Sequence, residues 1–293
     1  MIQEPVWVTG AGGLIGHWLV RTAAENAPGP QVRRLTHSDL ELTDSVAVIA
    51  RFKRERPRAV IHCAALSQST ACQANPALAR RVNVEVTSFL AELAAAIPFI
   101  FFSTDLVFDG RSGQYEESDK VNPLSVYAET KVEAERVVLQ NPQHTVVRTS
   151  LNGGPSPSGI RGFDEQVRHA WENGQTLRLF TDEFRSPIPA SITARAVWEL
   201  LATNRPGVYH VAGVERMSRW QIGQLLASLW PDIKPKMEAT SLKEYSGAPR
   251  PPDTSLNCDK VQRLLSFPLP RFSQWVTQGP ADGRGFSQLK SPP

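Results

Sequence analysis

Short apolar runs alternate with amphipathic stretches along the first half of the chain. The runs at 58–65 and 98–103 are almost continuously apolar, as strands buried on both faces of a sheet are. The stretches between the runs carry apolar residues at the spacing of a helix face. The strand-length runs are VWVTG (6–10), QVRRLT (31–36), RAVIHCAA (58–65), PFIFFS (98–103) and TVVRTS (145–150), and the helical stretches are 14–26, 45–56, 76–96 and the one that contains Tyr127.

This order of strands and helices predicts an α/β fold, a Rossmann-type doubly wound parallel sheet with right-handed crossovers. After residue 150 the alternation weakens at a loop rich in Gly, Pro and Ser, residues 153–162. We therefore predict a sheet domain over 1–150 and, over 151–278, mainly a smaller C-terminal substrate lobe with segments that return to the sheet. Residues 279–293 are expected to form a loosely held tail.

Composition and charge narrow the class of partner. The chain has 293 residues, of which 41% are hydrophobic and 21% charged, and its formal charge of +3 is too small to indicate nucleic acid. No apolar run approaches the roughly 20 residues of a membrane-spanning helix, and the N-terminus lacks the basic flank of a signal peptide. The cysteines, Cys63, Cys72 and Cys258, lack metal-ligand spacing and suit reduced thiols. We expect a cytoplasmic protein with no membrane or nucleic-acid partner.

A glycine-rich turn joins the first predicted strand to the first helix. TGAGGLIG (9–16) carries Gly10, Gly13 and Gly16 at G-x-x-G-x-x-G spacing. Glycine lets a pyrophosphate approach the backbone amides, and the helix N-terminus supplies unpaired N–H groups for the anion. A purely structural turn is the alternative, but the strand before and the helix after favour nucleotide binding. Residues 1–150 are therefore predicted to be an NAD(P)-binding domain.

The end of the second strand bears on the choice of nucleotide. A site for NAD usually carries an acidic residue there, on the ribose 2′-hydroxyl. Here no acid stands at the strand end, although Asp39 follows closely, and Arg33 and Arg34 precede it. NADP is favoured, with NAD as the alternative; solvent-facing strand residues are the other interpretation of the arginines. The residues predicted to contact this part of the cofactor are Thr36, His37 and Ser38.

Tyr127 and Lys131 are candidates for acid–base chemistry. At i and i+4 on a helix, their side chains lie on the same face. We expect the ammonium to lower the pKa of the phenol toward the range useful for proton transfer, and the lysine can also hold the nicotinamide ribose. An exposed Tyr–Lys pair is the alternative.

A second candidate is FFSTDLVFDG (101–110), where an apolar strand ends at Ser103 and Thr104. Their hydroxyls are expected at the carboxyl edge of the sheet, where ligands bind in open α/β folds. A hydroxyl there can bond to a substrate carbonyl as charge develops on its oxygen. An ordinary strand-end turn or helix cap is the alternative.

The order of these motifs resembles that of the extended short-chain dehydrogenase/reductases, and most of all their dTDP-4-dehydrorhamnose reductase group. STDLVFDG and RPPDTSLNCDK are its more specific motifs and the glycine turn its least specific one. The resemblance covers most of residues 5–265. The motifs that carry it are TGAGGLIG, VIHCAA, RRVNVE, FFSTDLVFDG, NPLSVYAETKVEAE, VVRTS, DEFRSPIPA, GVYHVAG and RPPDTSLNCDK.

The resemblance implies a role for each matching residue. Tyr127 would donate the proton to a ketone oxygen, Lys131 would tune it and bind ribose, and Thr104 would polarise the carbonyl. Asp105 would lie beside it in the substrate pocket, and Arg250 would face the diphosphate of a nucleotide-sugar substrate. The remaining implied contacts are Gly13, Leu14 and Ile15 with the pyrophosphate, Glu41 and Leu42 on the adenine side, Ala65, Leu66 and Ser67 by the nicotinamide half, and Asn83 as a support of the site.

Two departures from the family pattern lie near the implied sugar pocket. Leu106 stands where the family usually has Tyr, and Leu151 where it tends to have Trp, a residue that would contact the sugar. Neither change affects the residues implied in hydride and proton transfer, Thr104, Tyr127 and Lys131, but both leave the identity of the sugar open. The acidic residues that some relatives use for a metal-bridged dimer have no counterpart here, so no metal is expected; a homodimer is left open.

Three functions fit these observations. The first is an NADP(H)-dependent reductase that transfers hydride to C4 of a 4-keto-6-deoxy nucleotide-sugar, and the second is a nucleotide-sugar epimerase or dehydratase of the same family. The third is a non-catalytic NADP-binding regulatory subunit, which the intact Thr104–Tyr127–Lys131 set disfavours. Asp182 and Arg185 fit either a turn that closes over substrate or a structural salt bridge.

Overall fold

The computed structural model describes residues 4–26, 29 and 31–278. Its centre is a six-stranded sheet in which every neighbouring pair is parallel. The strand order is β10-β5-β4-β3-β1-β2, so the order along the chain reverses between β1 and β3. The strands are β1 (Val6–Thr9), β2 (Val32–Leu35), β3 (Ala59–His62), β4 (Phe99–Thr104), β5 (Thr145–Thr149) and β10 (Gly207–Val211).

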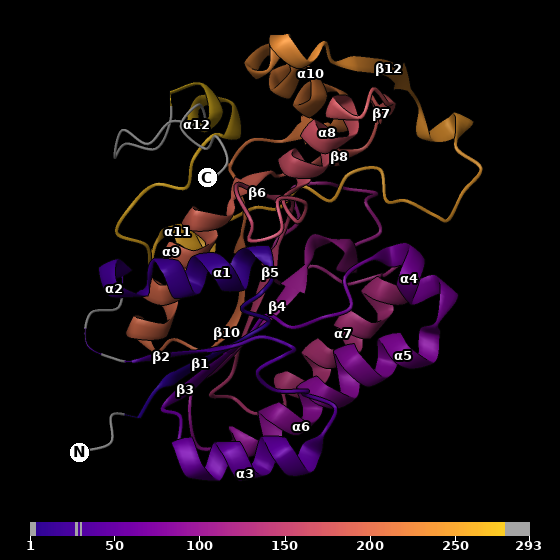
Figure 1. Cartoon of the computed structure of the whole chain (residues 1–293). Coiled ribbons are helices and arrows are strands. Elements are labelled where there is room, and N and C mark those ends of the chain that lie inside the picture. Colours follow the sequence, from indigo (N-terminus) through magenta and orange to yellow (C-terminus); the bar gives the residue numbers. More distant parts are fainter. Residues whose placement is uncertain (1–3, 27–28, 30, 279–293) are drawn as a thin grey trace.

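Helices cover both faces of this sheet (Figure 1). Alternate strand residues face opposite sides: Val8 packs into an apolar cluster with Leu19 and Trp198, whereas Trp7 packs into a second cluster with Leu90. The predicted α/β doubly wound fold is confirmed. One face carries α1 (Leu14–Arg21), α2 (Ala23–Asn26) and α9 (Ala190–Thr203), and the other carries α3 (Ser45–Glu55), α6 (Val86–Leu93) and α7 (Val126–Val138).

The helix predicted as continuous over 76–96 is interrupted. It consists of α5 (Pro76–Arg80), a π-helical turn at Arg81–Glu85 and then α6. Apolar spacing does not reveal such a turn, because apolar residues continue at helical intervals through it, at Leu78, Val82, Val86 and Leu90. The turn carries Asn83, whose side chain bonds outside the helix, and π turns of this kind occur often at functional sites.

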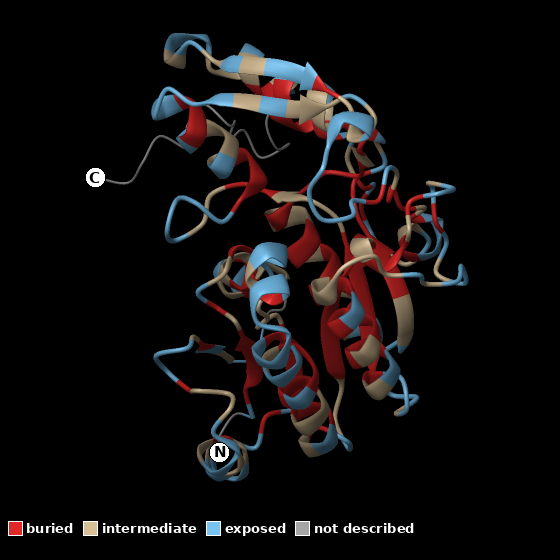
Figure 2. Ribbon diagram, turned by 90° about the vertical axis from the view of Figure 1, so that its right-hand side faces the viewer, coloured by how far each residue is buried: buried red, intermediate tan, exposed pale blue. Residues whose placement is uncertain are grey.

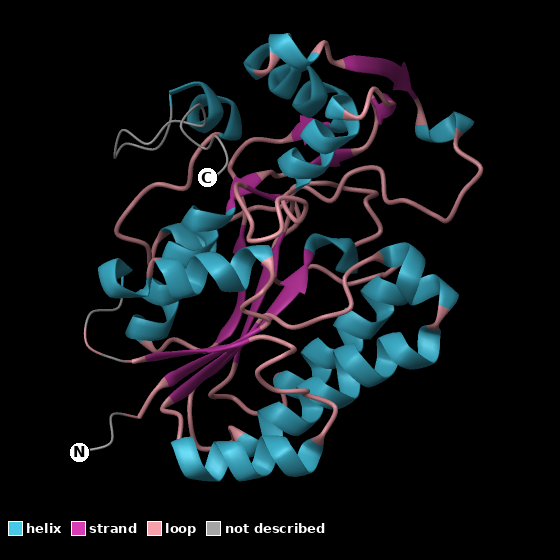
Figure 3. Ribbon diagram, in the orientation of Figure 1, coloured by secondary structure: helices cyan, strands magenta, loops and turns pink. Residues whose placement is uncertain are grey.

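The smaller lobe has its own apolar cluster, in which Phe163, Trp171, Leu226 and Phe272 pack together. Figure 3 shows this lobe as short helices and short strands at the top of the sheet, and Figure 2 shows the buried strands below it. Its elements are β6 (Asn152–Gly153), α8 (Phe163–Glu172), β7 (Thr176–Phe180), β8 (Phe184–Arg185), β9 (Ile188–Pro189), β11 (Met217–Ser218), α10 (Arg219–Leu229), β12 (Lys236–Thr240) and α12 (Phe272–Gln278). The remaining short elements are α4 (Ser69–Ala74), α11 (Asp259–Gln262) and three 3-10 turns, Asp105–Val107, Pro231–Ile233 and Leu242–Glu244, of which the last two belong to the lobe.

Elements from beyond residue 150 pack with the sheet. Strand β10 pairs with β5, and α9 packs on α1, where the Trp198 indole donates a hydrogen bond to the Leu19 carbonyl oxygen at 3.1 Å. A domain boundary near residue 150 stays a prediction, and the predicted tail at 279–293 lies outside the described residues. None of the helices in the described ranges is long and apolar enough to cross a membrane.

Candidate active site

A cleft of about 1150 Å³ follows the carboxyl ends of the sheet strands, past the point where the strand order reverses. This is the position at which open α/β sheets bind ligands. The cleft brings together every predicted site residue except Asp105 and Arg250. The predicted residues that line it are Gly10, Gly13, Leu14, Ile15, Gly16, Thr36, His37, Ser38, Glu41, Leu42, Ala65, Leu66, Ser67, Ser103, Thr104, Tyr127, Lys131 and Leu151.

The glycine turn has a geometry that only glycine adopts without strain. Gly10 has a φ of +65°, and a Cβ at this residue would lie 2.6 Å from the Ala64 amide nitrogen. A Cβ on Gly16 would collide with the Gly10 carbonyl oxygen. Gly13 is the N-cap of α1 and offers no side-chain cap. The first amides of α1 are therefore available to an anion in the cleft.

Side chains with hydroxyl groups line the part of the cleft that follows β2. The Thr36 hydroxyl donates to the Asp39 carboxylate at 2.6 Å and lies 2.9 Å from the Ser38 hydroxyl. The Arg33 guanidinium is paired with Glu55 at 3.2 Å and does not line the cleft, which fits the structural interpretation of this arginine. Arg81, from the π turn, lines the cleft instead, and the sequence pattern gave no sign of it.

Tyr127 lies in the first turn of α7, where the Ser125 hydroxyl caps the helix by accepting from the Ala128 amide at 3.3 Å. Burial raises the pKa of the Tyr127 phenol, and the negative charge of Asp105 raises it further. The Thr104 hydroxyl acts in the opposite direction. Our expectation of a lowered phenol pKa is therefore wrong for this state of the protein, because burial outweighs the nearby cations.

Lys131 is 2% exposed, and its Nζ lies 3.9 Å from the centroid of the Phe101 ring. Burial lowers the pKa of Lys131 to about 7, although the Glu135 carboxylate opposes this. The lysine thus changes charge near neutral pH, while the phenol stays protonated there. A protonated phenol is the state that a proton donor needs.

Asn83 links the two sides of the cleft. Its side-chain oxygen accepts from the Leu66 amide at 2.8 Å, and its side-chain nitrogen donates to the Leu66 carbonyl at 3.1 Å and to the Thr130 hydroxyl at 3.0 Å. The Thr130 hydroxyl in turn donates to the Tyr127 carbonyl oxygen at 2.7 Å. The loop after β3 and the start of α7 are therefore held in a fixed relation, which agrees with the supporting role implied for Asn83.

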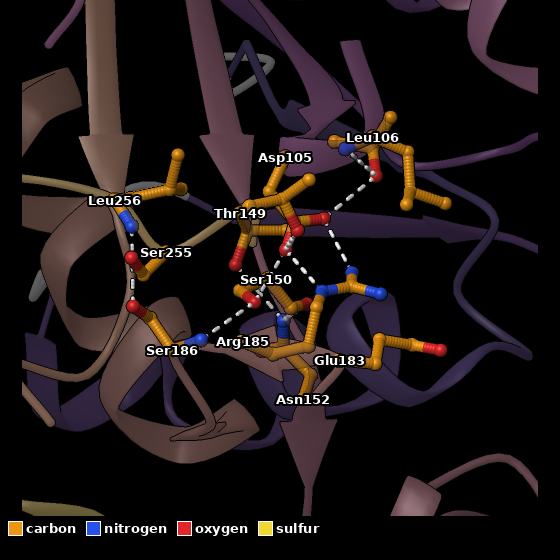
Figure 4. A network of polar contacts seen from close by, with 12 residues as sticks. Asp105, Leu106, Thr149, Ser150, Asn152, Glu183, Arg185, Ser186, Ser255 and Leu256 are labelled. Carbon is orange, nitrogen blue, oxygen red and sulfur yellow. Dashed lines mark hydrogen bonds and ion pairs between the residues drawn. The ribbon is translucent and has the colours of Figure 1, made fainter. Parts of the chain in front are cut away.

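Asp105 is not among the residues that line the cleft, and Figure 4 shows it within a network of polar contacts. It is fully buried, and its carboxylate accepts hydrogen bonds from Arg185 Nε at 2.6 Å, the Ser150 hydroxyl at 2.6 Å and the Thr254 hydroxyl at 3.2 Å. With its oxygens so occupied, it holds protein elements together and does not face a substrate. Arg185 forms a structural salt bridge, but with Asp105; the Asp182 carboxylate accepts from the Ser241 hydroxyl at 2.6 Å.

Arg250 also lies outside the lining of the cleft, because Glu183 holds it in the lobe by hydrogen bonds of 2.6 and 3.0 Å. A different arginine, Arg219, reaches the cleft and bonds the same carboxylate at 2.9 Å. Arg219 belongs to no sequence motif and needs the folded lobe to reach the site, so it could not be predicted from the sequence. Other lining residues that were not predicted include Asn152, Arg161, Phe163 and Gln166.

Ser103 has a polar atom without a partner. Its hydroxyl oxygen is buried and makes no hydrogen bond within the part of the chain that the structure describes. Because Ser103 lines the cleft, a polar atom of a ligand there can satisfy it. In the same described ranges, no group of three His, Cys, Asp or Glu residues is arranged to hold a metal ion, and the expectation of no metal stays a prediction.

Comparison with known proteins identifies the family. Residues 4–281 match the RmlD substrate binding domain. The chain belongs to this family. The resemblance to the dTDP-4-dehydrorhamnose reductase group is thereby confirmed.

Relatives of the RmlD family with different names are similar over most of their length. The chain is 31% identical to a probable low-salt glycan biosynthesis reductase, Agl14, of Haloferax volcanii, over 90% of this chain and 93% of that one. It is 28% identical to a dTDP-4-dehydrorhamnose reductase of Sinorhizobium fredii, over 91% and 93%. It is also 28% identical to methionine adenosyltransferase 2 subunit beta of Xenopus laevis, over 88% and 81%.

A solved structure agrees with the fold. The crystal structure of a hypothetical dTDP-4-dehydrorhamnose reductase from Sulfolobus tokodaii superimposes with a TM-score of 0.81 at 27% identity, over 92% of this chain and 97% of that one. The relatives thus include proteins named as reductases and one named as a subunit of another enzyme.

The glycine turn generates a first prediction. Gly16→Ala should weaken binding of a nicotinamide dinucleotide at least about 10-fold, because the added Cβ collides with the Gly10 carbonyl and displaces the turn. Titration of protein fluorescence with NADPH measures this. Gly12→Ala is the control, since its Cβ would have only an ordinary contact with Thr36, at 3.7 Å. Equal affinity for NADPH in both variants would contradict the assigned role of the turn.

The burial of Lys131 generates a second prediction. Its pKa in the folded protein, about 7, lies below the ordinary value of 10.5, so the unfolded chain binds more protons between these values. The wild type therefore gains stability as pH rises through this range. At about pH 6, Lys131→Met should be more stable by at least about 1 kcal/mol, and this excess should shrink toward about pH 10.

Urea denaturation at several pH values measures the excess for Lys131→Met. The exposed Lys120→Met is the matched control and should show no such trend. An excess that is absent, or that does not change with pH, would refute the buried state of the ammonium.

Proposed function

We propose that the protein is an NADP(H)-dependent reductase of a 4-keto-6-deoxy nucleotide-sugar, with Tyr127 as the proton donor to the C4 ketone oxygen. The observation that carries the proposal is that Thr104, Tyr127 and Lys131 line the same cleft as the glycine turn. The relatives named as reductases support it.

The cleft fits a nicotinamide dinucleotide. Glycine lets the turn pack tightly against its own backbone and that of Ala64 while it lines the cleft. The first amides of α1 have no side-chain cap, and Thr36 and Ser38 line the same cleft. No carboxylate stands at the end of β2 itself, which favours NADP, with NAD as the alternative. When bound, the cofactor supplies the hydride. The chain's own contribution is to orient the ketone and to supply the proton.

The residues at the end of β4 and the start of α7 can polarise a ketone and protonate it. The Thr104 hydroxyl accepts from the Leu106 amide and donates to Asp105, both over a long 3.2 Å, so its proton can turn to a carbonyl oxygen instead. The unpartnered Ser103 hydroxyl offers a further donor in the same lining. As negative charge develops on the oxygen, the protonated Tyr127 phenol transfers its proton to it. Lys131 lies one helical turn away and, when charged, stabilises the phenolate that remains.

Two other functions remain alternatives. An epimerase or dehydratase of the same family uses the same three residues but recycles its nicotinamide, whereas a reductase consumes NADPH in stoichiometric amounts. The similarity to methionine adenosyltransferase 2 subunit beta is the observation that supports the second alternative, a non-catalytic regulatory subunit. The complete Thr104–Tyr127–Lys131 set in the cleft favours an enzyme. The cytoplasmic location and a homodimeric state stay predictions.

The test of the proposal uses the phenol. Tyr127→Phe should lower turnover of a dTDP-linked 4-keto-6-deoxy sugar roughly 10²- to 10⁴-fold, because the proton donor is lost, while affinity for NADPH changes little. Loss of NADPH absorbance measures turnover. Tyr209→Phe, which alters a buried tyrosine outside the cleft, is the control. Turnover by Tyr127→Phe close to that of the wild type would eliminate the phenol as the acid. Recycling of the nicotinamide without net NADPH loss would instead favour the epimerase or dehydratase.

A further inference from the structure

A cluster of charged side chains forms the wall where the lobe meets the cleft. Glu183 is 2% exposed and bonds two arginines, Arg219 at 2.9 Å and Arg250 at 2.6 Å. Two residues further along the chain, Arg185 pairs with Asp105. These five residues contain three guanidinium groups and two carboxylates, so one positive charge is left over.

Of the three arginines in this cluster, Arg219 is the one that lines the cleft, so the excess positive charge of the cluster is accessible there. Arg185 is 5% exposed and occupied by Asp105, and Arg250 lies outside the lining. The side chain of Arg219 is 23% exposed and lines the cleft, as Thr149, Ser150 and Leu151 also do. Burial disfavours the charge of Arg219 and Glu183 stabilises it, whereas the neighbouring guanidinium groups of Arg185 and Arg250 repel it. An anion that reaches the cleft would relieve this repulsion.

The backbone around Arg219 is rigid. Its amide donates to the Glu183 carbonyl oxygen at 3.0 Å, and the preceding residue, Ser218, pairs with Phe184 in the β8–β11 ladder. Ser218 and Gln221 cap the start of α10 reciprocally, with bonds of 2.8 and 3.1 Å. The guanidinium is thus held by Glu183 on one side before any ligand arrives, so little freedom remains to be lost on binding.

We propose that Arg219 binds the diphosphate of the nucleotide-sugar, and that Glu183 and Arg250 act as positioning residues behind it. The proposal rests on the proposed function, since that function supplies an anionic substrate. It changes the assignment that the resemblance implied, because Arg250 is engaged by Glu183 away from the lining whereas Arg219 faces the cleft. After a guanidinium has bonded one carboxylate, it still has free N–H donors, and these can form charge-assisted hydrogen bonds to phosphate oxygens.

Calorimetry with UDP and dTDP, added to the protein saturated with NADP, tests the proposal. Arg219→Met should weaken binding of the nucleoside diphosphate that the wild type prefers roughly 10- to 100-fold, because charge-assisted hydrogen bonds are lost. Affinity for NADPH should stay within about twofold, since Arg219 is placed on the substrate side. Arg219→Lys keeps the positive charge but lacks the planar set of N–H donors of a guanidinium, and should weaken binding by an intermediate factor.

Arg216→Met is the matched control. Arg216 lies three residues before Arg219 and is likewise paired with a carboxylate, Asp253, at 2.6 Å, but it does not line the cleft. Binding by this variant should equal that of the wild type. If Arg219→Met does not fold, the Arg219→Lys measurement decides, because that variant retains a cation beside Glu183.

The outcomes separate the two proposals. Weaker diphosphate binding by the Arg219 variants, with unchanged NADPH affinity and a normal Arg216→Met, supports the assignment. Unchanged diphosphate binding by the folded Arg219 variants overturns it and leaves the proposed function intact. A wild type that binds NADPH but neither nucleoside diphosphate overturns both.

Discussion

The buried ion pair between Asp105 and Arg185 is the interaction on which the rest of the structure depends. It joins the end of β4, in the middle of the sheet, to the lobe strand β8, which lies 80 residues further along the chain. Both side chains are almost fully buried, so each charge needs the other. Hydroxyls of Ser150 and Thr254 complete the coordination of the carboxylate. The pair thereby holds together strand ends from both parts of the molecule.

The electrostatics of the cleft follow from this pair. Burial raises the pKa of the Tyr127 phenol, Asp105 raises it further and Arg185 partly cancels the effect of Asp105, so a charge outside the lining of the cleft helps to keep the phenol protonated. Beside the pair, Glu183 balances Arg219 and Arg250 only in part. These two neighbouring groups of ion pairs thus act on the Tyr127 phenol and leave a positive charge at Arg219, which lines the cleft. Charged side chains of the lobe, Arg185 and Arg219, thus contribute to the electrostatic potential in the cleft.

The features that the sequence predicted are local ones. The glycine turn, the Tyr127–Lys131 spacing and the hydroxyls that end β4 are each contained in a short segment, and all of them line the cleft. The features that it missed depend on contacts between distant segments. Neither the burial of Asp105 nor the approach of Arg219 can be inferred from spacing, since both require the lobe to fold onto the sheet. The lowered phenol pKa was expected from the nearby lysine, but burial, which no motif encodes, had the larger effect.

A double-mutant cycle on the free energy of unfolding tests the central role of the Asp105–Arg185 pair most directly. Asp105→Asn and Arg185→Met should each cost roughly 3–5 kcal/mol, because each leaves the other charge buried and unpaired. The double variant should lose less than the sum of the two by at least about 2 kcal/mol. Single costs that add to within about 0.5 kcal/mol would contradict the account, since the two side chains would then act independently.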